Sequence, residues 1–169
     1  VYKRQVKLLE GTKAQVLDTR KTTPGIRLLE KWAVKIGGGV NHRFGLFDMM
    51  MIKDNHIDIA GSIESAIEKA INYQKDKEIK IPIVVEARNL EEVNKILRVG
   101  NIQRIMLDNF SYDDTRIAVE QIGGRFETEA SGGITEETII EHALCGVDFI
   151  SIGALTHSVN SLDLSLKAF

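Results

Sequence analysis

The segment 81–109, IPIVVEARNLEEVNKILRVGNIQRIMLDN, contains one complete strand–helix–strand repeat. Its two apolar runs, 81–87 and 104–109, have the length and the aliphatic content of buried strands. Between them, Asn89 and Glu92 have the spacing of a capping box, and apolar residues follow at helical intervals. Nearly continuous apolar strands joined by a helix are typical of a parallel sheet covered by helices. The segment therefore predicts an α/β fold.

The same alternation extends over the rest of the chain. Apolar residues at helical intervals mark residues 63–71, and Thr135 is expected to cap a helix over 136–144. The candidate strands are residues 13–19, 48–54, 81–87, 104–109, 125–130 and 148–154, with a weaker seventh at 162–169.

The residues at the C-terminal ends of these strands favour a barrel over an open sheet. The first six strands each end in a charged or glycine-rich element, and successive elements are 22 to 33 residues apart, which is one strand–helix unit. Barrels build their active sites from all the loops at this rim, whereas an open sheet concentrates such residues at a switch point. We therefore expect a TIM-like α/β barrel of six to seven parallel strands. The rim elements are Arg20–Lys21, Lys53–Asp54, Glu86, Asp108, Ser131–Gly132–Gly133 and Gly153.

Composition is that of a single-domain globular protein. The chain has 169 residues, of which 43% are hydrophobic and 27% charged, and this length allows one sizeable core. No apolar run reaches the roughly 18 residues of a membrane helix, and no secretory signal is visible at the polar, basic start. The single cysteine, Cys145, excludes an internal disulfide and a cysteine-built metal site, and it is expected to be buried. We expect no membrane partner and a cytoplasmic location.

The charge is distributed unevenly, although the net charge is only −2. Residues 1–60 contain 11 Lys and Arg against 6 Asp and Glu, a balance of +5, whereas residues 61–169 contain 11 against 18, a balance of −7. A nucleic-acid-binding protein needs a broad basic face, so we expect no nucleic acid partner. The basic first third is compatible with a local pocket for a small anion.

The first five residues, VYKRQ, contain no initiator Met and connect to no recognisable motif. We interpret residues 1–5 as a non-native remnant at the start of a truncated chain. Residues 6–169 are then the α/β-barrel domain.

Cationic and ionisable side chains gather on the first two rim segments, at Arg20, Lys21, His42, Arg43 and Lys53. A single histidine or arginine in such a loop is most often simply solvated, but five on adjacent loops favour a binding site. Arginine holds a planar carboxylate with two parallel hydrogen bonds, whereas lysine acts as a point charge. The mixture predicts a substrate with several carboxylates or phosphates.

Two acidic side chains, Glu86 and Asp108, end neighbouring apolar strands. A carboxylate in this position is either a structural group or a functional one. Side by side, the two could hold sugar hydroxyls or a Mg²⁺ ion with its phosphates. Asp54 is a weaker third candidate, because it could simply pair with Lys53.

Small residues mark two further rim loops. Ser131, Gly132 and Gly133 come just before a predicted helix start, where backbone N–H groups and the helix dipole can bind a phosphate. Gly153 lies in a second small-residue loop after the next strand, and paired phosphate-binding loops after the last two strands recur in barrels. Either loop alone is also compatible with an ordinary turn.

The sequence has no Walker motif and no G-x-G-x-x-G fingerprint, and no nucleophile–histidine–acid arrangement is evident. A polycationic pocket with two acids and a phosphate loop fits group transfer on a sugar phosphate. In such a reaction, electrostatic stabilisation rather than a covalent nucleophile lowers the barrier.

Five motifs carry a resemblance to a known family. They are DTRKTTPGIR (18–27), GGGVNHRFGLFDMMMIKDNHI (37–57), MLDN (106–109), ETEASGGIT (127–135) and SIGALTHS (151–158). Over about residues 8–169 the chain resembles quinolinate phosphoribosyltransferase, also called nicotinate-nucleotide pyrophosphorylase (carboxylating). The resemblance implies that quinolinate and phosphoribosyl pyrophosphate react to give nicotinate mononucleotide, pyrophosphate and CO₂, in the synthesis of NAD. It also implies a Mg²⁺ cofactor, a homodimer or higher homo-oligomer, and an N-terminal α/β domain that this chain lacks.

The resemblance gives a role to each rim residue. The residues expected to hold the two quinolinate carboxylates are Arg20, His42, Arg43 and Lys53. Lys21 is expected near the pyrophosphate, and Glu86 and Asp108 at the ribose hydroxyls and the metal. The residues expected to take the 5′-phosphate are Ser131, Gly132, Gly133, Gly153 and His157. The catalytic set is Lys21, Lys53, Glu86 and Asp108.

Two alternatives stay open at this point. One is a related phosphoribosyltransferase-like protein for another anionic substrate, such as the molybdenum-associated paralogues, although His42, Arg43 and Lys53 together favour quinolinate. The other is an inactive phosphate-binding fragment. The sequence VEARNLEE (85–92) also departs from the VEVDNLEE common in the family, so the contacts beside Glu86 are expected to differ.

Overall fold

The structure, a computed structural model, describes residues 2–158 and 165–168. Within them, strands and helices alternate, and every strand pairing is parallel. The strands are β1 Gln15–Leu17, β2 Met50–Ile52, β3 Ile83–Ala87, β4 Arg104–Asp108, β5 Glu127–Ser131 and β6 Phe149–Ser151. The helices are α1 Tyr2–Leu8, α2 Arg27–Ile36, α3 Asp54–Ala60, α4 Ile63–Asp76, α5 Leu90–Val99, α6 Tyr112–Ile122, α7 Ile139–Leu144 and α8 Ala154–His157.

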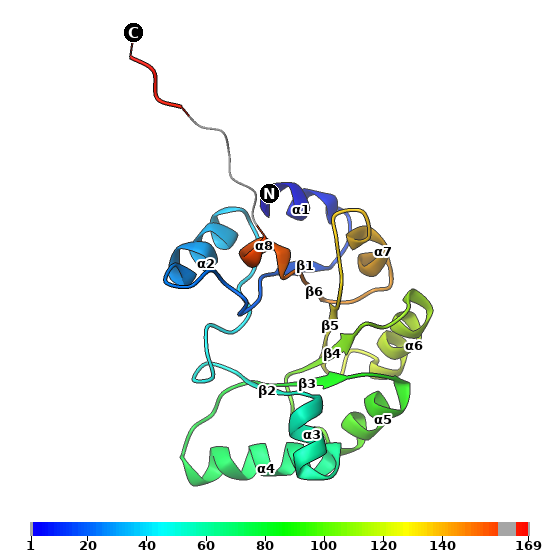
Figure 1. Cartoon of the computed structure of the whole chain (residues 1–169). Coiled ribbons are helices and arrows are strands. Elements are labelled where there is room, and N and C mark those ends of the chain that lie inside the picture. The colour runs from blue at the N-terminus through cyan, green and yellow to red at the C-terminus, as the bar shows by residue number, and fades with distance from the viewer. Residues whose placement is uncertain (1, 159–164, 169) are drawn as a thin grey trace.

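The strands pair in the order β1-β6-β5-β4-β3-β2. Each strand from β2 to β6 thus lies beside its neighbour in sequence, and the last strand returns to the first. This is the order of a barrel and not of a doubly wound sheet. Among the described residues the curved sheet stays open between β1 and β2, where a single bridge joins Leu17 to Val40 (Figure 1). The predicted TIM-like α/β barrel is confirmed.

The six predicted strands are all present but shorter than predicted. The strand predicted at 48–54, for example, is paired only over Met50–Ile52, because Lys53 already serves as the N-cap of α3. The predicted seventh strand at 162–169 is not confirmed. Residues 165–168 are outside any strand, and the rest of that segment lies outside the described residues.

Side chains along the strands alternate between two environments. Val85 and Ile105 belong to the hydrophobic core between the sheet and the helices. Helices α4, α5, α6 and α7 cover this outer face (Figure 1). Glu86, Met106 and Glu129 are aligned across β3, β4 and β5 on the opposite, inner face. The interior of the barrel is therefore partly polar, and its charged groups need partners.

The start of α5 follows the sequence prediction in part. The side chain of Asn89 caps the helix, because its Oδ1 accepts the N–H of Glu92 at 2.9 Å. The reciprocal bond of a capping box does not form. The Glu92 carboxylate accepts the backbone N–H of Arg88 at 2.7 Å instead, and it also binds the Arg88 guanidinium.

Helix α2 buries a charge and exposes its apolar side. Lys31 is only 3% exposed and Val34 is fully buried, whereas the exposed fractions of Leu28, Trp32 and Ile36 are 62 to 71%. A surface helix normally turns its apolar stripe toward the core. The inward face of α2 therefore combines the apolar Val34 with the polar contacts of Lys31, and these polar contacts lie beside the candidate site.

Residues 2–5, which the sequence marks as a remnant, form the first part of α1. Gln5 is 4% exposed and Arg4 pairs with Glu136, while α1 contacts both β1 and α7. The segment thus has a place in the fold, and its interpretation as a remnant stays a prediction.

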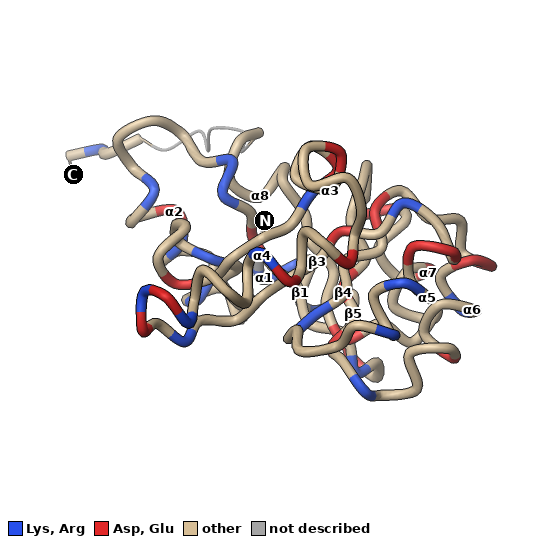
Figure 2. The backbone as a smooth tube through the Cα atoms, turned by 90° about the horizontal axis from the view of Figure 1, so that it is seen from below, with Lys and Arg blue, Asp and Glu red and all other residues tan. Residues whose placement is uncertain are grey.

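The charge asymmetry of the sequence is visible in space. Basic segments lie along the chain beside α2 and α8, whereas acidic segments are frequent around α5, α6 and α7 (Figure 2). Cys145 is buried, as predicted, and burial raises the pKa of its thiol. In the part of the chain that the structure describes, no helix is long and apolar enough to cross a membrane.

Candidate active site

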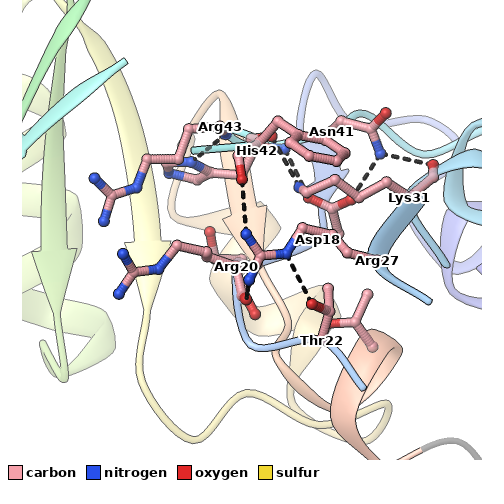
Figure 3. Close-up of polar contacts among 12 residues, drawn as sticks. Asp18, Arg20, Thr22, Arg27, Lys31, Asn41, His42 and Arg43 are labelled. Carbon is pink, nitrogen blue, oxygen red and sulfur yellow. Dashed lines mark hydrogen bonds and ion pairs between the residues drawn. The ribbon is translucent and has the colours of Figure 1, made fainter. Parts of the chain in front are cut away.

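The segment after β1 and the segment after Val40 run side by side at the rim. The N–H of Val40 donates to the carbonyl of Val16 at 2.8 Å, and the N–H of Asp18 donates to the carbonyl of Val40 at 3.2 Å. These bonds bring Arg20 and Arg43 to one place, although 22 residues separate them in the chain. Their side chains extend in the same direction (Figure 3). The predicted grouping of these two cations is thus present.

Arg43 is held in an unfavourable environment for a free cation. It is 7% exposed, and its Nη1 has no hydrogen-bond partner among the described residues. Burial and the positive charge of Arg20 both lower the pKa of the Arg43 guanidinium, and Asp48 offsets only part of this. In the same part of the chain, no carboxylate forms an ion pair with Arg20, Lys21 or Arg43. The arrangement is suited to binding an anion.

The imidazole of His42 is turned into the barrel. Its Nδ1 accepts the N–H of Arg43 at 2.7 Å, which assigns the proton to Nε2. That nitrogen lies 3.3 Å from Oε2 of Glu129, and both side chains are buried. The His42 ring thus contacts the backbone of Arg43 on one side and Glu129 on the other. Its contact with substrate stays a prediction.

A buried network around Glu129 was not predicted from the sequence. Its carboxylate is completely buried and accepts hydrogen bonds from Arg104 Nη1 at 2.9 Å and from the hydroxyl of Ser151. Arg104 also binds Glu127 and lies over the Phe149 ring at 3.9 Å. Burial alone would raise the pKa of Glu129, but His42, Arg104 and Ser151 together lower it. Charged residues two apart in β5 are the sequence signal of this inward polar face.

On the next strand ends, Lys53 and Glu86 form an ion pair. The Lys53 Nζ and Glu86 Oε2 atoms are 2.5 Å apart, with the Lys53 side chain 44% exposed and that of Glu86 8% exposed. Lys53 thus pairs with Glu86 and, among the described residues, not with Asp54, whose carboxylate accepts the N–H of Asn55 at 2.7 Å. Lys53 and Glu86 therefore act together at the mouth.

Asp108 and the glycine loop are brought together by strand register. Asp108 pairs with Ser131 across β4 and β5. On the inner face of β4 it is the next residue after Met106, and Met106 pairs with Glu86 of β3. The Asn109 side chain donates to Asp108 at 2.8 Å and covers Gly132, where a Cβ atom would lie 2.2 Å from Asn109 Oδ1. The glycine is thus required for this close approach.

No group of three potential metal ligands occurs among the described histidines, cysteines and acids. The predicted metal residues, Glu86 and Asp108, lie on adjacent strands, and Glu86 already binds Lys53. Two carboxylates do suit Mg²⁺ that is shared with the phosphates of a substrate.

The helix predicted after the glycine loop begins later than expected. The loop Ser131–Gly133 is followed by turns, because Thr138 Oγ1 accepts the N–H of Thr135 at 2.9 Å, and α7 begins only at Ile139. The predicted Thr135 cap is wrong, and the dipole of this short helix does not act on the loop. Any anion there would have to bind the loop N–H groups directly.

Lys21, Gly153 and His157 form a third group. The Thr156 hydroxyl donates to the carbonyl of Lys21 at 2.7 Å, which ties α8 to the segment after β1. A Cβ atom on Gly153 would lie 2.7 Å from His157 Nε2, so the imidazole covers the glycine. The backbone of Lys21 thus lies against α8, and His157 lies against Gly153 at the same edge of the mouth.

Two cavities flank the mouth. One of about 560 Å³ is lined by Thr22, Thr23, Pro24, Gly25, Arg27, Leu28 and Phe44. The other, of about 340 Å³, is lined by Arg88, Asn89, Leu90, Glu91, Asn109, Phe110, Ser111 and Asp114. Neither of these two cavities is lined by Arg20, Lys53 or Glu86.

The fold and the site define an α/β-barrel domain with arginine, lysine and carboxylate side chains gathered at the C-terminal ends of its strands. A sequence model described as quinolinate phosphoribosyl transferase, C-terminal domain, matches residues 2–167. The chain belongs to this family.

Individual relatives agree with the family. The chain is 53% identical to the chloroplastic nicotinate-nucleotide pyrophosphorylase (carboxylating) of Arabidopsis thaliana, over 91% of this chain and 48% of that protein. It is 45% identical to a probable nicotinate-nucleotide pyrophosphorylase (carboxylating) of Bacillus subtilis (strain 168), over 95% of this chain and 54% of that protein. The solved nicotinate-nucleotide pyrophosphorylase from Francisella tularensis matches with a TM-score of 0.91 and 45% identity, over 98% of this chain and 57% of that chain. The chain spans about half the length of the curated relatives it matches.

Proposed function

We propose that this chain supplies the barrel site of an enzyme that transfers phosphoribosyl from phosphoribosyl pyrophosphate to quinolinate. The products are nicotinate mononucleotide, pyrophosphate and CO₂. The observation that carries the proposal is the pair of Arg20 and Arg43, which extend together without a carboxylate partner among the described residues. Curated relatives are named for this activity, which supports the same conclusion.

Quinolinate presents two carboxylates on adjacent ring atoms, and its binding needs cationic donors at a fixed spacing. Arg20 and Arg43 can each hold one carboxylate through two parallel N–H donors. The buried Nη1 of Arg43 favours an anion strongly, because it has lost its hydration without gaining a partner in the described part of the chain. Lys53 adds a third positive charge from the next strand end.

The phosphoribosyl donor fits the other side of the mouth. Lys21 would offer positive charge to a phosphate there, and the His157 imidazole, which covers Gly153, would offer a ring nitrogen. The backbone N–H groups of Ser131–Gly133 could add donors to the same phosphate. Glu86 and Asp108 are the acceptors for the ribose hydroxyls.

The carboxylates of Glu86 and Asp108 fit a Mg²⁺ ion that arrives with phosphoribosyl pyrophosphate. Mg²⁺ is commonly held by one or two carboxylates, substrate phosphates and water. When bound, the ion would neutralise negative charge on the leaving pyrophosphate. Lys21 would hold that pyrophosphate from the protein side.

The proposed reaction needs no side-chain nucleophile. As pyrophosphate leaves the ribose, positive charge develops on the sugar ring, and Glu86 and Asp108 can stabilise it. The pyridine nitrogen then bonds to the anomeric carbon. When CO₂ departs from the adjacent carbon, the cationic ring nitrogen stabilises the electron pair left on that carbon, and a proton from solvent then bonds to it. Arg20 and Arg43 keep the ring oriented through both steps.

For the full-length protein we further propose a homodimer or higher homo-oligomer, no nucleic acid partner and a cytoplasmic location. The resemblance to the family supports the oligomer, and the composition supports the other two. Some curated relatives are named chloroplastic or mitochondrial, so cell fractionation is the test of location. The names of the relatives do not favour a molybdenum-associated paralogue.

Calorimetric titration of quinolinate into the chain, with nicotinate as the one-carboxylate control, tests the substrate. Salt-sensitive binding of quinolinate over nicotinate is expected. The variant Lys53→Ala should abolish quinolinate binding and spare phosphate binding, whereas Lys69→Ala, an exposed lysine of α4, should change neither. Equal loss of both ligands in Lys53→Ala would contradict its role, and a folded chain that binds no quinolinate would contradict the proposal for this barrel alone.

A further inference from the structure

The inward face of α2 presents two cations, Arg27 and Lys31, which are four residues apart and therefore lie one above the other. Arg27 donates three hydrogen bonds and Lys31 donates two. All five end on the two chain segments that carry the candidate anion-binding arginines, residues 18–22 and 41–44. Figure 3 shows both cations between these segments.

Lys31 closes a buried ring of polar groups. Its Nζ donates to Asp18 Oδ1 at 2.7 Å and to the carbonyl of His42 at 2.9 Å. The Asp18 carboxylate also accepts the N–H of His42 at 2.8 Å and the side-chain amide of Asn41 at 2.6 Å. Asp18 is completely buried and Lys31 is 3% exposed, so every polar group in the ring depends on the others.

Arg27 spans the same two segments one helical turn earlier. Its Nη2 donates to the carbonyl of Arg20 at 3.2 Å, and its Nη1 donates to the carbonyl of Phe44 at 3.0 Å. Its Nε donates to the Thr22 hydroxyl at 2.9 Å. All three nitrogens of the guanidinium are thus engaged. The planar fork fixes the distance between the backbone at residue 20 and that at residue 44.

We propose that Arg27 and Lys31, with Asp18, are positioning residues that set the spacing between Arg20 and Arg43. That spacing selects ligands with two carboxylates over ligands with one. The inference rests on the proposed function, because it names what sets the specificity of that same site. Neither Arg27 nor Lys31 contacts the substrate in this proposal.

A purely stabilising role does not account for the pattern. A buried ion pair such as Lys31 and Asp18 is often matched or exceeded in stability by apolar side chains of similar volume. Helix α2 has such side chains, yet Leu28 and Trp32 face outward and the cation faces inward. What the polar contacts add is a defined geometry for two segments that are far apart in sequence.

The decisive variant is Arg27→Lys, which keeps the charge and removes the fork. Its matched control is Arg125→Lys, because Arg125 also binds two backbone carbonyls, those of Gln121 and Ile122, away from the mouth. Quinolinate and nicotinate are titrated into each chain. We expect Arg27→Lys to weaken quinolinate binding by about tenfold, a change of about 1.4 kcal/mol, and nicotinate binding much less. The preference for two carboxylates then falls, whereas Arg125→Lys keeps it.

Two results would overturn the proposal. One is a wild-type preference in Arg27→Lys, because charge alone would then suffice. The other is an equal loss for both ligands, because a general structural effect would produce it. Amide hydrogen exchange separates these failures from failure of the proposed function. The His42 amide, which is bonded to Asp18, should exchange faster in Arg27→Lys, while the Asn109 amide, bonded to the Ser131 carbonyl, should not change.

If the wild-type chain binds neither ligand, the proposed function fails for this barrel and the exchange result decides the positioning claim. Faster exchange at His42 alone supports it, and unchanged exchange overturns it. A second variant guards against unfolding. Lys31→Met combined with Asp18→Asn removes both buried charges together, and it should retain a folded chain that has lost the preference for quinolinate. A folded double variant with the wild-type preference would also overturn the proposal.

Discussion

Inside the barrel, the charge of Glu129 is matched by Arg104 and supported by Ser151, whereas at the mouth Arg20 and Arg43 share no carboxylate among the described residues. The two regions are neighbours, and His42 links them. Its backbone lies at the mouth and its ring lies 3.3 Å from Glu129. The interior charges are paired within the protein, whereas the charges at the mouth need a ligand to pair with.

A buried charge is tolerated in a folded protein when it is paired and hydrogen-bonded. The pair of Glu129 and Arg104 meets that condition without any outside partner, so its contribution is to stability and to the placement of His42. The mouth does not meet it, because the Arg43 Nη1 is buried without a partner among the residues that the structure describes. An anionic ligand would supply what is missing there. Variants at the two places should therefore affect different quantities.

The largest effect is expected from Glu129→Ala. It leaves the Arg104 guanidinium, whose side chain is 8% exposed, with only the partly exposed Glu127. Removal of one partner of a buried pair costs about 3–5 kcal/mol, and urea denaturation would measure the loss in free energy of unfolding. The control Glu127→Gln, at a carboxylate 35% exposed, should cost less than about 1 kcal/mol. Similar small losses in both variants would remove the distinction between the regions.

Arg43→Met should show the opposite behaviour. The variant removes a desolvated cation that Arg20 repels, so the free energy of unfolding should not fall. Binding of quinolinate should weaken by about 1.5–3 kcal/mol, the value of hydrogen bonds to charged groups. Thermal denaturation and calorimetry on the same sample give both numbers. A destabilised variant with unchanged affinity would mean that Arg43 belongs to the structural set.

The residues of the mouth could be predicted because their positions relative to the strands are visible in the sequence. Arg20, Glu86 and Asp108 each follow or end an apolar run, and parallel strands bring such ends to one rim. Their partners are less visible. The choice of Glu86 and not Asp54 as the partner of Lys53 depends on how the chain turns into α3.

The interior network could not be predicted in the same way. That Arg104, Glu129 and Ser151 face one another depends on the register of three strands, and a shift by one residue would turn each side chain to the opposite face. The inverted burial of α2 is a similar case. Lys31 is buried because it pairs with Asp18, which lies just after β1. The periodicity of the helix sequence does not indicate that Lys31 faces inward.

The pH dependence of stability sharpens the comparison with a smaller effect. His42, Arg104 and Ser151 hold the pKa of Glu129 below its usual range in spite of burial. A lowered pKa in the folded state contributes stability above the pKa of the unfolded state, and this stability is lost as the pH falls through the folded value. The free energy of unfolding should therefore decrease in acid, and less steeply in Glu129→Gln. An equally steep decrease in both chains would show that Glu129 gains nothing from its partners.

The smallest change in stability is expected at Lys53 and Glu86, which lie between the two regions. The pair has the geometry of the interior network, but the Lys53 side chain is 44% exposed. An ion pair with one exposed partner contributes about 0–1 kcal/mol. In a double-mutant cycle with Lys53→Ala and Glu86→Ala, the coupling in the free energy of unfolding should stay within that range and decrease at high salt. If the coupling free energy were as large as that of the Glu129–Arg104 pair and did not change with salt, Lys53 would belong with the charges that are paired inside the protein. Its charge would then be unavailable to a ligand, and the mouth would have to bind quinolinate with Arg20 and Arg43 alone.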